Sequence, residues 1–263
     1  KEMLYDYCET RNVPHRRCGK LVVAQEEEQQ LQNLHENAKR LGVEVRMLTG
    51  REASEREPEV KCAAALESPT TGILDSHHYL SSLLADAEGA SLALNTRVLD
   101  IQNKKVFTAQ GTIDCQVVVN AAGLSAASFA GVTAEFAKGN CFGCRRRPFN
   151  GLVYPLPEPG GLGIHATVNL DGHNRFGPDV ELIRADEPFD YSVEESRKSK
   201  FAQAIRSYWP NVREDDLYPD YSGIRPKLDA SDDFSIFKED GVVHLLGIES
   251  PGLTASLAIA DHC

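Results

Sequence analysis

A stretch near the C-terminus combines an apolar strand, two glycines and a helix of small residues, a combination that can hold a ligand. Residues 243–248 predict a short strand, and residues 253–260 predict a helix. Gly247 and Gly252 let the backbone turn sharply and come close to a ligand. Thr254 and the free amides of the first helical turn can receive a polar or anionic group, or one edge of a flat cofactor. The alternative interpretation is an ordinary corner between a strand and a helix.

Length and charge limit the possible classes of protein. A chain of 263 residues suits one large α/β domain or two interleaved domains. Its formal net charge of −11 argues against nucleic acid or an anionic membrane surface as the main partner. The longest apolar run, residues 117–124, is too short to span a bilayer and fits a buried strand.

The cysteines indicate a reducing compartment inside the cell. Seven cysteines, an odd number, are scattered along the chain, which favours free thiols. Cys141 and Cys144 form a lone C-x-x-C without a second ligand pair, so no metal site is expected there. The chain opens at Lys1 in a helical pattern with no signal or transit peptide in view, and we expect a fragment or a processed form.

Hydrophobic spacing and turn residues predict alternating helices and strands, followed by an antiparallel region from residue 136 onward. Thr49, Asp75 and Ser192 are the expected helix caps. Helices are predicted over 25–41, 49–57, 77–87 and 193–208, and strands over 19–24, 43–48, 91–95, 98–102, 105–108, 112–120, 151–156, 161–170, 175–180, 221–228 and 234–238.

Three segments together resemble the D-amino-acid-oxidase-like family of FAD-dependent oxidoreductases. Residues 117–123 resemble the strand and glycine turn that touch the flavin, and residues 222–227 resemble a G-x-R-P element whose arginine binds the substrate carboxylate. The stretch 243–260 resembles the C-terminal FAD-binding turn and helix. The branch of L-2-hydroxyglutarate dehydrogenases and their bacterial relatives is the most similar, through residues 18–24, 68–75, 137–140, 154–165 and 175–179.

The resemblance implies an α/β (α+β) fold with two interleaved domains. Residues 73–135 and 221–263 would form the FAD-binding domain, and residues 1–72 and 136–220 an antiparallel-sheet substrate domain. The family begins with a βαβ unit whose G-x-G-x-x-G turn holds the FAD pyrophosphate. This chain contains no G-x-G-x-x-G, so the implied Rossmann-like domain is incomplete.

The resemblance also assigns the chemistry of a site that oxidises a 2-hydroxy acid. Arg225 would bind the substrate carboxylate with two parallel hydrogen bonds, although a surface arginine is the alternative. His165 would take the hydroxyl proton, and Tyr154 would offer its hydroxyl to the substrate. A buried, hydrogen-bonded histidine and a half-buried tyrosine are the alternatives. Lys138 and Arg175 could bind a second carboxylate, or could be plain strand residues.

FAD is the expected cofactor, held mainly by backbone contacts. The helix start near the flavin ring would stabilise the negative charge of the reduced flavin. The expected contacts are Val98 on the adenine side, Ala121, Ala122 and Gly123 near the pyrophosphate and ring, and Gly247, Pro251, Gly252, Leu253 and Thr254 around the isoalloxazine.

The functional expectation is flavin-dependent oxidation of a small 2-hydroxy acid similar to L-2-hydroxyglutarate. Electrons would pass to a quinone, an electron-transfer flavoprotein or oxygen, in the mitochondrion of a eukaryote or the cytoplasm of a bacterium. Two alternatives stay open. The protein could oxidise an amino acid with the same arginine, or it could be a degenerate flavoprotein kept as a non-catalytic subunit of a larger complex.

Overall fold

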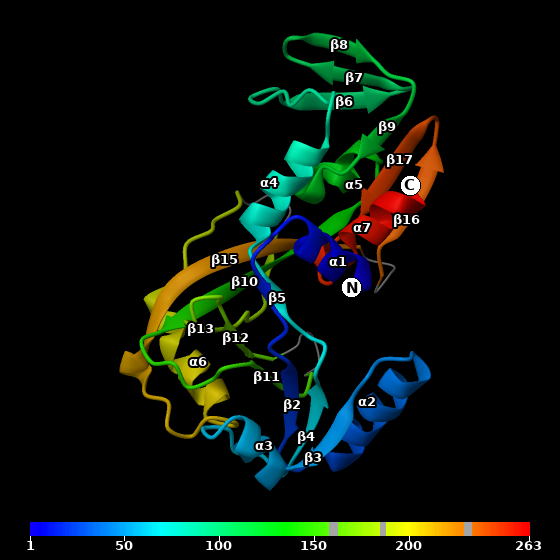
Figure 1. The fold of residues 1–263 in the computed structure, drawn as a ribbon. Coiled ribbons are helices and arrows are strands. Elements are labelled where there is room, and N and C mark those ends of the chain that lie inside the picture. Colours follow the sequence, from blue (N-terminus) through cyan, green and yellow to red (C-terminus); the bar gives the residue numbers. More distant parts are fainter. Residues whose placement is uncertain (158–162, 185–187, 229–232) are drawn as a thin grey trace.

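The computed structural model describes residues 1–157, 163–184, 188–228 and 233–263. Within these residues its largest sheet has nine strands in the order β14-β10-β13-β12-β11-β2-β4-β3, with β15 pairing to β10 (Figure 1). The described pairs of this sheet are antiparallel except the parallel pair of β2 and β11. The strands are β2 (Lys20–Ala24), β3 (Arg46–Thr49), β4 (Ala64–Ser68), β10 (Ala134–Cys144), β11 (Leu152–Pro155), β12 (Ala166–Val168), β13 (Asn174–Phe176), β14 (Glu181–Ile183) and β15 (Leu217–Leu228).

One face of the large sheet carries the main hydrophobic core. Side chains alternate between the two faces of a strand, so Leu21 and Val23 point to the same side as Val153. Phe176 and Trp209 stack there with ring centroids 5.8 Å apart. Helix α6 (Lys198–Ile205) and helix α3 (Gly50–Arg56) cover this face with residues that include Phe201, Ile205 and Ala53.

The opposite face of the same strands carries polar and aromatic side chains. Lys20 precedes the inward-pointing Leu21, and Tyr154 follows Val153, so both project to this second face. Leu152 of β11 lies opposite Lys20 in the parallel register. Tyr154, two residues further along β11, therefore lies diagonally across from Lys20. Helix α2 (Glu28–Arg40) packs against part of this face through the buried Leu31.

Strand β15 is long and pairs with β10 along most of its length. An irregularity in the register lies at residues 220–221 of β15, and from Ser222 the strand pairs regularly through Gly223 to Arg225, which lies opposite Ala137. Regular alternation therefore places Arg225 on the same face as Gly223. The predicted domain boundary at residue 220 falls inside this strand, so residues 221–228 belong to the large sheet.

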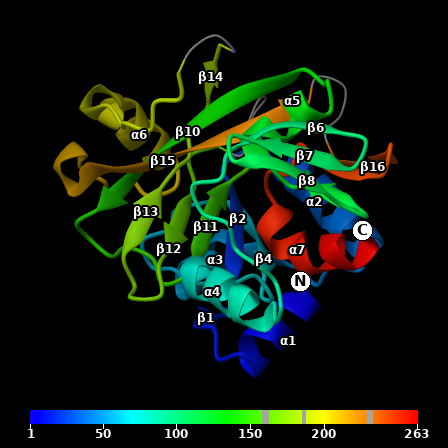
Figure 2. The ribbon, with the colours of Figure 1, turned by 90° about the horizontal axis from the view of Figure 1, so that it is seen from above.

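Two small sheets and the helices beside them form a smaller unit at one end of the molecule (Figure 1). Strand β17 pairs parallel with β9 and antiparallel with β16, and a separate meander contains β6, β7 and β8. Both views place α7, next to this small sheet, on the opposite side of the molecule from α6 (Figure 1, Figure 2). Its elements are β6 (Val98–Gln102), β7 (Lys105–Thr108), β8 (Gly111–Asp114), β9 (Val118–Asn120), α5 (Ala126–Phe129), β16 (Ser235–Glu239), β17 (Val242–Leu246) and α7 (Gly252–His262).

Two N-terminal helices and one short sheet join the two parts. Helix α1 packs on α4 and α7 through a cluster of Leu4, Cys8, Val13 and Tyr79, with Leu257 of α7 against it. The Tyr79 hydroxyl lies 2.8 Å from that of Ser256. These elements are α1 (Glu2–Thr10), β1 (His15–Arg16), β5 (Ile73–Leu74) and α4 (Ser76–Asp86).

Local sequence signals located several elements correctly and misplaced others. The Thr49 side chain accepts from the Glu52 amide in a capping box, and Asp75 accepts from the His78 amide at 2.9 Å, so two predicted caps are confirmed. The prediction of a strand at residues 91–95 is wrong, because that stretch is a turn and irregular chain. The predicted helix 193–208 begins later, as a 3₁₀ turn at Glu195–Arg197 followed by α6, and Ser192 does not cap it.

The expected strand at 161–170 is shorter in the structure. Only Ala166–Val168 forms a strand, β12, and residues 161 and 162 lie outside the described part of the chain. No helix within the described residues is long and apolar enough to cross a membrane.

Candidate active site

Two of the three predicted catalytic residues lie against each other. The rings of Tyr154 and His165 stack with centroids 3.9 Å apart and an angle of 15° between their planes. Tyr154 lies on β11, and His165 directly precedes β12. Strands β11 and β12 pair antiparallel, with Val153 opposite Ala166. Because Ala166 points into the core, its neighbour His165 faces the other side of the sheet, where Tyr154 also projects.

The surroundings of His165 keep its imidazole neutral. Burial, which is the largest cause, and the positive charges of Lys20 and Arg225 lower the pKa of His165 to about 4, although a hydrogen bond to the Gly163 carbonyl acts in the opposite direction. Nδ1 lies 3.3 Å from the Gly163 carbonyl oxygen, and since a carbonyl can only accept, Nδ1 carries the proton. Nε2 therefore keeps its lone pair and can accept a proton.

The hydroxyl of Tyr154 stays protonated at neutral pH. Burial raises the pKa of this phenol to about 12, with smaller contributions from Cys18 and Tyr221. A neutral phenol can donate a hydrogen bond to a substrate oxygen. Its ring also fixes the plane of the His165 imidazole through the stacking contact.

Arg225 reaches the same site from a different strand. It lies on β15, which is separated from β12 by the two strands β10 and β13, and its charge acts on the pKa of His165. The guanidinium has one long contact, from Nη1 to Oε2 of Glu249 at 3.6 Å. Within the described residues no other hydrogen bond or ion pair engages its side chain, so most of its donors are open to a ligand.

Lys20 belongs to the site although the sequence did not single it out. Its ammonium lies 5.0 Å from the centre of the Tyr154 ring. Burial, and to a smaller degree the charge of Lys1, lower the pKa of Lys20. Its only sequence signal is a charged residue at the start of an otherwise apolar strand, and its place depends on the pairing of β2 with β11.

The structure gives the other two candidate cations acidic partners. The Lys138 ammonium is buried and lies 3.4 Å from a carboxylate oxygen of Asp190. Arg175 forms an ion pair with Asp220, and its guanidinium lies 4.4 Å from the centre of the Tyr221 ring. Both side chains are therefore occupied within the fold.

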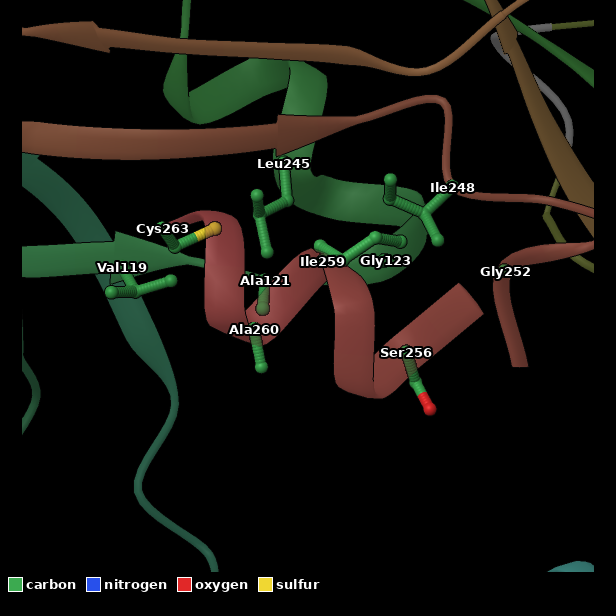
Figure 3. Close-up of a pocket in the computed structure, with 10 residues that line it drawn as sticks. All are labelled: Val119, Ala121, Gly123, Leu245, Ile248, Gly252, Ser256, Ile259, Ala260 and Cys263. Carbon is green, nitrogen blue, oxygen red and sulfur yellow. The ribbon is translucent and has the colours of Figure 1, made fainter. Parts of the chain in front are cut away.

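A groove of 440 Å³ lies between β9 and α7, next to several of the predicted flavin contacts (Figure 3). Figure 3 shows Ala121 and Gly123 on one side of it and the helix with Ile259 and Ala260 on the other. Gly123 has a φ of +58°, and a side chain added there would meet no atom within 4 Å. Ten residues line the groove: Val119, Ala121, Gly123, Leu245, Ile248, Gly252, Ser256, Ile259, Ala260 and Cys263.

The start of α7 lies where three cavities meet. Gly252 lines the groove, Thr254 lines a second cavity with Lys1 and Tyr5, and Gly247 and Pro251 line a third. No side chain caps this helix, and the amides of Leu253 and Thr254 have no acceptor within the described residues. The helix start therefore offers two amide donors to a ligand.

The turn after β9 is fixed by a buried asparagine. The Asn120 amide nitrogen donates to the Ala126 carbonyl at 2.8 Å and lies 3.0 Å from Nδ1 of His244. The side-chain oxygen of Asn120 accepts from the Ala122 amide at 3.4 Å. Ala121, Ala122 and Gly123 are thereby held beside the groove, whereas Val98 lies apart from it on the β6–β8 meander.

The neutral state of His165 predicts a pH dependence of stability. The unfolded chain takes up a proton at the usual histidine pKa of 6.5, whereas folded His165 does so only at about 4. The contribution of His165 to the free energy of unfolding is therefore fully present above pH 6.5. It is lost as the pH drops towards 4, by at most about 3 kcal/mol. Urea unfolding at pH 7.5 and 4.5 should show this fall in the parent protein and a smaller fall in His165→Gln. Equal falls in both proteins would contradict the assignment.

Comparison with known proteins shows that the whole chain matches one protein family. The family described as FAD dependent oxidoreductase matches residues 1–263. The mitochondrial L-2-hydroxyglutarate dehydrogenase of Arabidopsis thaliana is 38% identical over 331 residues, covering 100% of this chain and 68% of that protein. The L-2-hydroxyglutarate dehydrogenase of the bacterium Indibacter alkaliphilus is 24% identical, covering 97% and 79%.

Solved structures share the fold. L-alpha-glycerophosphate oxidase from Mycoplasma pneumoniae, with FAD bound, matches with a TM-score of 0.82 and 22% identity, over 95% of this chain and 72% of that one. L-proline dehydrogenase from P. horikoshii matches with a TM-score of 0.81 and 21% identity, over 98% and 74%. The predicted α/β fold class is thereby confirmed.

Proposed function

The chain belongs to the family of FAD-dependent oxidoreductases, and from this premise we propose that it oxidises a small 2-hydroxy acid of the L-2-hydroxyglutarate class. One observation carries the proposal. A neutral, buried His165 stacks on Tyr154 within the electrostatic range of Arg225, so a proton acceptor and a carboxylate-binding cation share one site. The mitochondrial relative that is 38% identical, named as an L-2-hydroxyglutarate dehydrogenase, supports the choice of a hydroxyl substrate.

The residues present fit the ring end of FAD. The apolar groove beside Ala121 and Gly123 has room for a flat group, and the free amides of Leu253 and Thr254 can hold the polar edge of the flavin. The 263 residues contain no G-x-G-x-x-G, so nothing here fits the pyrophosphate in the usual way. When bound, the flavin supplies the acceptor for the hydride that leaves Cα of the substrate.

The side chains of the site have separate tasks. Arg225 binds the substrate carboxylate and thereby orients the 2-hydroxyl group. Nε2 of His165 accepts the hydroxyl proton, and Nδ1–H stays on the Gly163 carbonyl. An anionic substrate also neutralises part of the positive field that lowers the pKa of His165. Substrate binding therefore makes His165 a stronger base.

The electron acceptor and the compartment are further parts of the proposal. A quinone, an electron-transfer flavoprotein or oxygen would take the electrons from the reduced flavin, with the protein alone or as part of a larger complex. Two of the relatives, from Arabidopsis thaliana and Nematostella vectensis, are named as mitochondrial. We propose the mitochondrion for a eukaryotic host and the cytoplasm for a bacterial one.

Flavin bleaching tests the function directly. The encoded protein, purified with its flavin, is mixed without oxygen with a panel of 2-hydroxy acids and the matching 2-amino acids. Loss of flavin absorbance with a 2-hydroxy acid and not with its amino counterpart is the expected result. Bleaching only by amino acids would make the protein an amino-acid oxidase or dehydrogenase. A protein that binds no flavin and oxidises neither group would be a non-catalytic relative.

A further inference from the structure

Among the residues that the structure describes, no acidic side chain neutralises one cation of the site. Within the described residues neither a hydrogen bond nor an ion pair holds the Lys20 ammonium, and its one close contact is the face of Tyr154 at 5.0 Å. The nearby charge that acts on it is another cation, Lys1, whose own ammonium donates to the Thr70 hydroxyl at 2.6 Å. A half-buried ammonium without a counterion favours an anionic ligand.

The other basic side chains of this region differ from Lys20 in this respect. Lys138 is paired with Asp190, Arg175 with Asp220, and Arg225 has its long contact with Glu249. Lys138 and Arg175, which the sequence suggested for a second carboxylate, are thus engaged, while Lys20 has no acidic partner in the part of the chain that the structure describes. The free cation also projects from the sheet face that carries Tyr154 and His165.

The arrangement has two cations around one proton acceptor. Lys20 contacts the Tyr154 ring, Tyr154 stacks on His165, and the charges of Lys20 and Arg225 both act on the His165 imidazole. Lys20 comes from β2 and Arg225 from β15, which lie in different parts of the large sheet with β11, β12, β13 and β10 between them. A substrate with one carboxylate can engage only one of these cations.

We propose that Lys20 binds the second carboxylate of a dicarboxylic 2-hydroxy acid, while Arg225 binds the carboxylate next to the hydroxyl. This inference rests on the proposed function, because it assumes that the carboxylate on Arg225 belongs to the substrate. Lys20 thereby determines the specificity for dicarboxylic over monocarboxylic substrates. Charge-assisted hydrogen bonds of this kind contribute about 10- to 100-fold in affinity.

Paired substrates and matched variants test the role of Lys20. The flavin-loaded parent, Lys20→Met, Lys20→Arg and the exposed control Lys39→Met are compared on 2-hydroxyglutarate and on 2-hydroxyvalerate, which lacks the second carboxylate. Lys20→Met should raise KM for 2-hydroxyglutarate about 10- to 100-fold and leave KM for 2-hydroxyvalerate unchanged. Any change in kcat that comes from removing a positive charge near His165 should be the same for both substrates. Lys20→Arg should restore part of the loss, and Lys39→Met should behave as the parent.

Two results would overturn the proposal. The first is an equal rise in KM for both substrates in Lys20→Met, which would mean that Lys20 supports the fold and does not bind the second carboxylate. The second is an unchanged KM for 2-hydroxyglutarate. Glutarate binding by calorimetry separates this inference from the proposed function, since it needs no turnover. If the parent oxidises no 2-hydroxy acid yet binds glutarate through Lys20, the function fails and the dicarboxylate site stands; if glutarate binds equally to Lys20→Met, the site fails.

Discussion

Replacing His165 with glutamine is expected to lower kcat for a 2-hydroxy acid by about 10²- to 10⁴-fold, the usual contribution of a positioned general base. Glutamine keeps a polar side chain that can still meet the Gly163 carbonyl, but it has no basic nitrogen. Anaerobic bleaching of the flavin, followed by stopped flow, measures the step directly. KM should change little, because Arg225 and Lys20 still bind the carboxylates.

The residual activity of His165→Gln should rise steadily with pH. With the base removed, the substrate must lose its proton to hydroxide in solution, whose concentration increases with pH. His77→Gln is the matched control, since His77 is an exposed histidine on α4. Tyr154→Phe should cost much less than His165→Gln, because it keeps the ring that stacks on the imidazole. A His165→Gln protein with the parent kcat would remove His165 from the mechanism.

The sequence predicted best those features that depend on neighbouring residues. The caps at Thr49 and Asp75 rest on side chains that bond to amides three residues away, so the local pattern contains all the necessary information. The strand predicted over residues 221–228, which is part of β15, and the helix after Gly252 were likewise predicted from local patterns. The stretch 91–95 shows the limit, since apolar residues there alternate without any strand to pair with.

The composition of the site depends on pairing between distant segments. Lys20 faces Tyr154 only because β2 pairs in parallel with β11, about half of the chain away. Lys138 and Arg175 are neutralised by Asp190 and Asp220, and no local spacing indicates these ion pairs. The sequence therefore indicated which residue types could bind a carboxylate, but it could not tell free cations from paired ones.

Replacing Arg225 with methionine is expected to lower kcat/KM by about 10²- to 10³-fold, the effect of removing one side of a charge-assisted pair in a partly buried site. Methionine keeps an unbranched stem that can pack in the same space. The loss should fall mainly on KM, because the carboxylate is bound in the ground state as well as in the transition state. It should affect 2-hydroxyglutarate and 2-hydroxyvalerate alike, since both carry the carboxylate next to the hydroxyl.

Glu249 provides the sharpest control for this assignment. Its carboxylate lies 3.6 Å from Arg225 and 3.8 Å from Lys227, so it competes with the substrate for the guanidinium. Glu249→Gln should therefore lower KM or leave it unchanged, in the direction opposite to Arg225→Met. Arg206→Met, at an exposed arginine, should match the parent on both substrates. If Arg225→Met turns over with an unchanged KM, the guanidinium binds Glu249 as a structural pair, and the substrate carboxylate lies elsewhere.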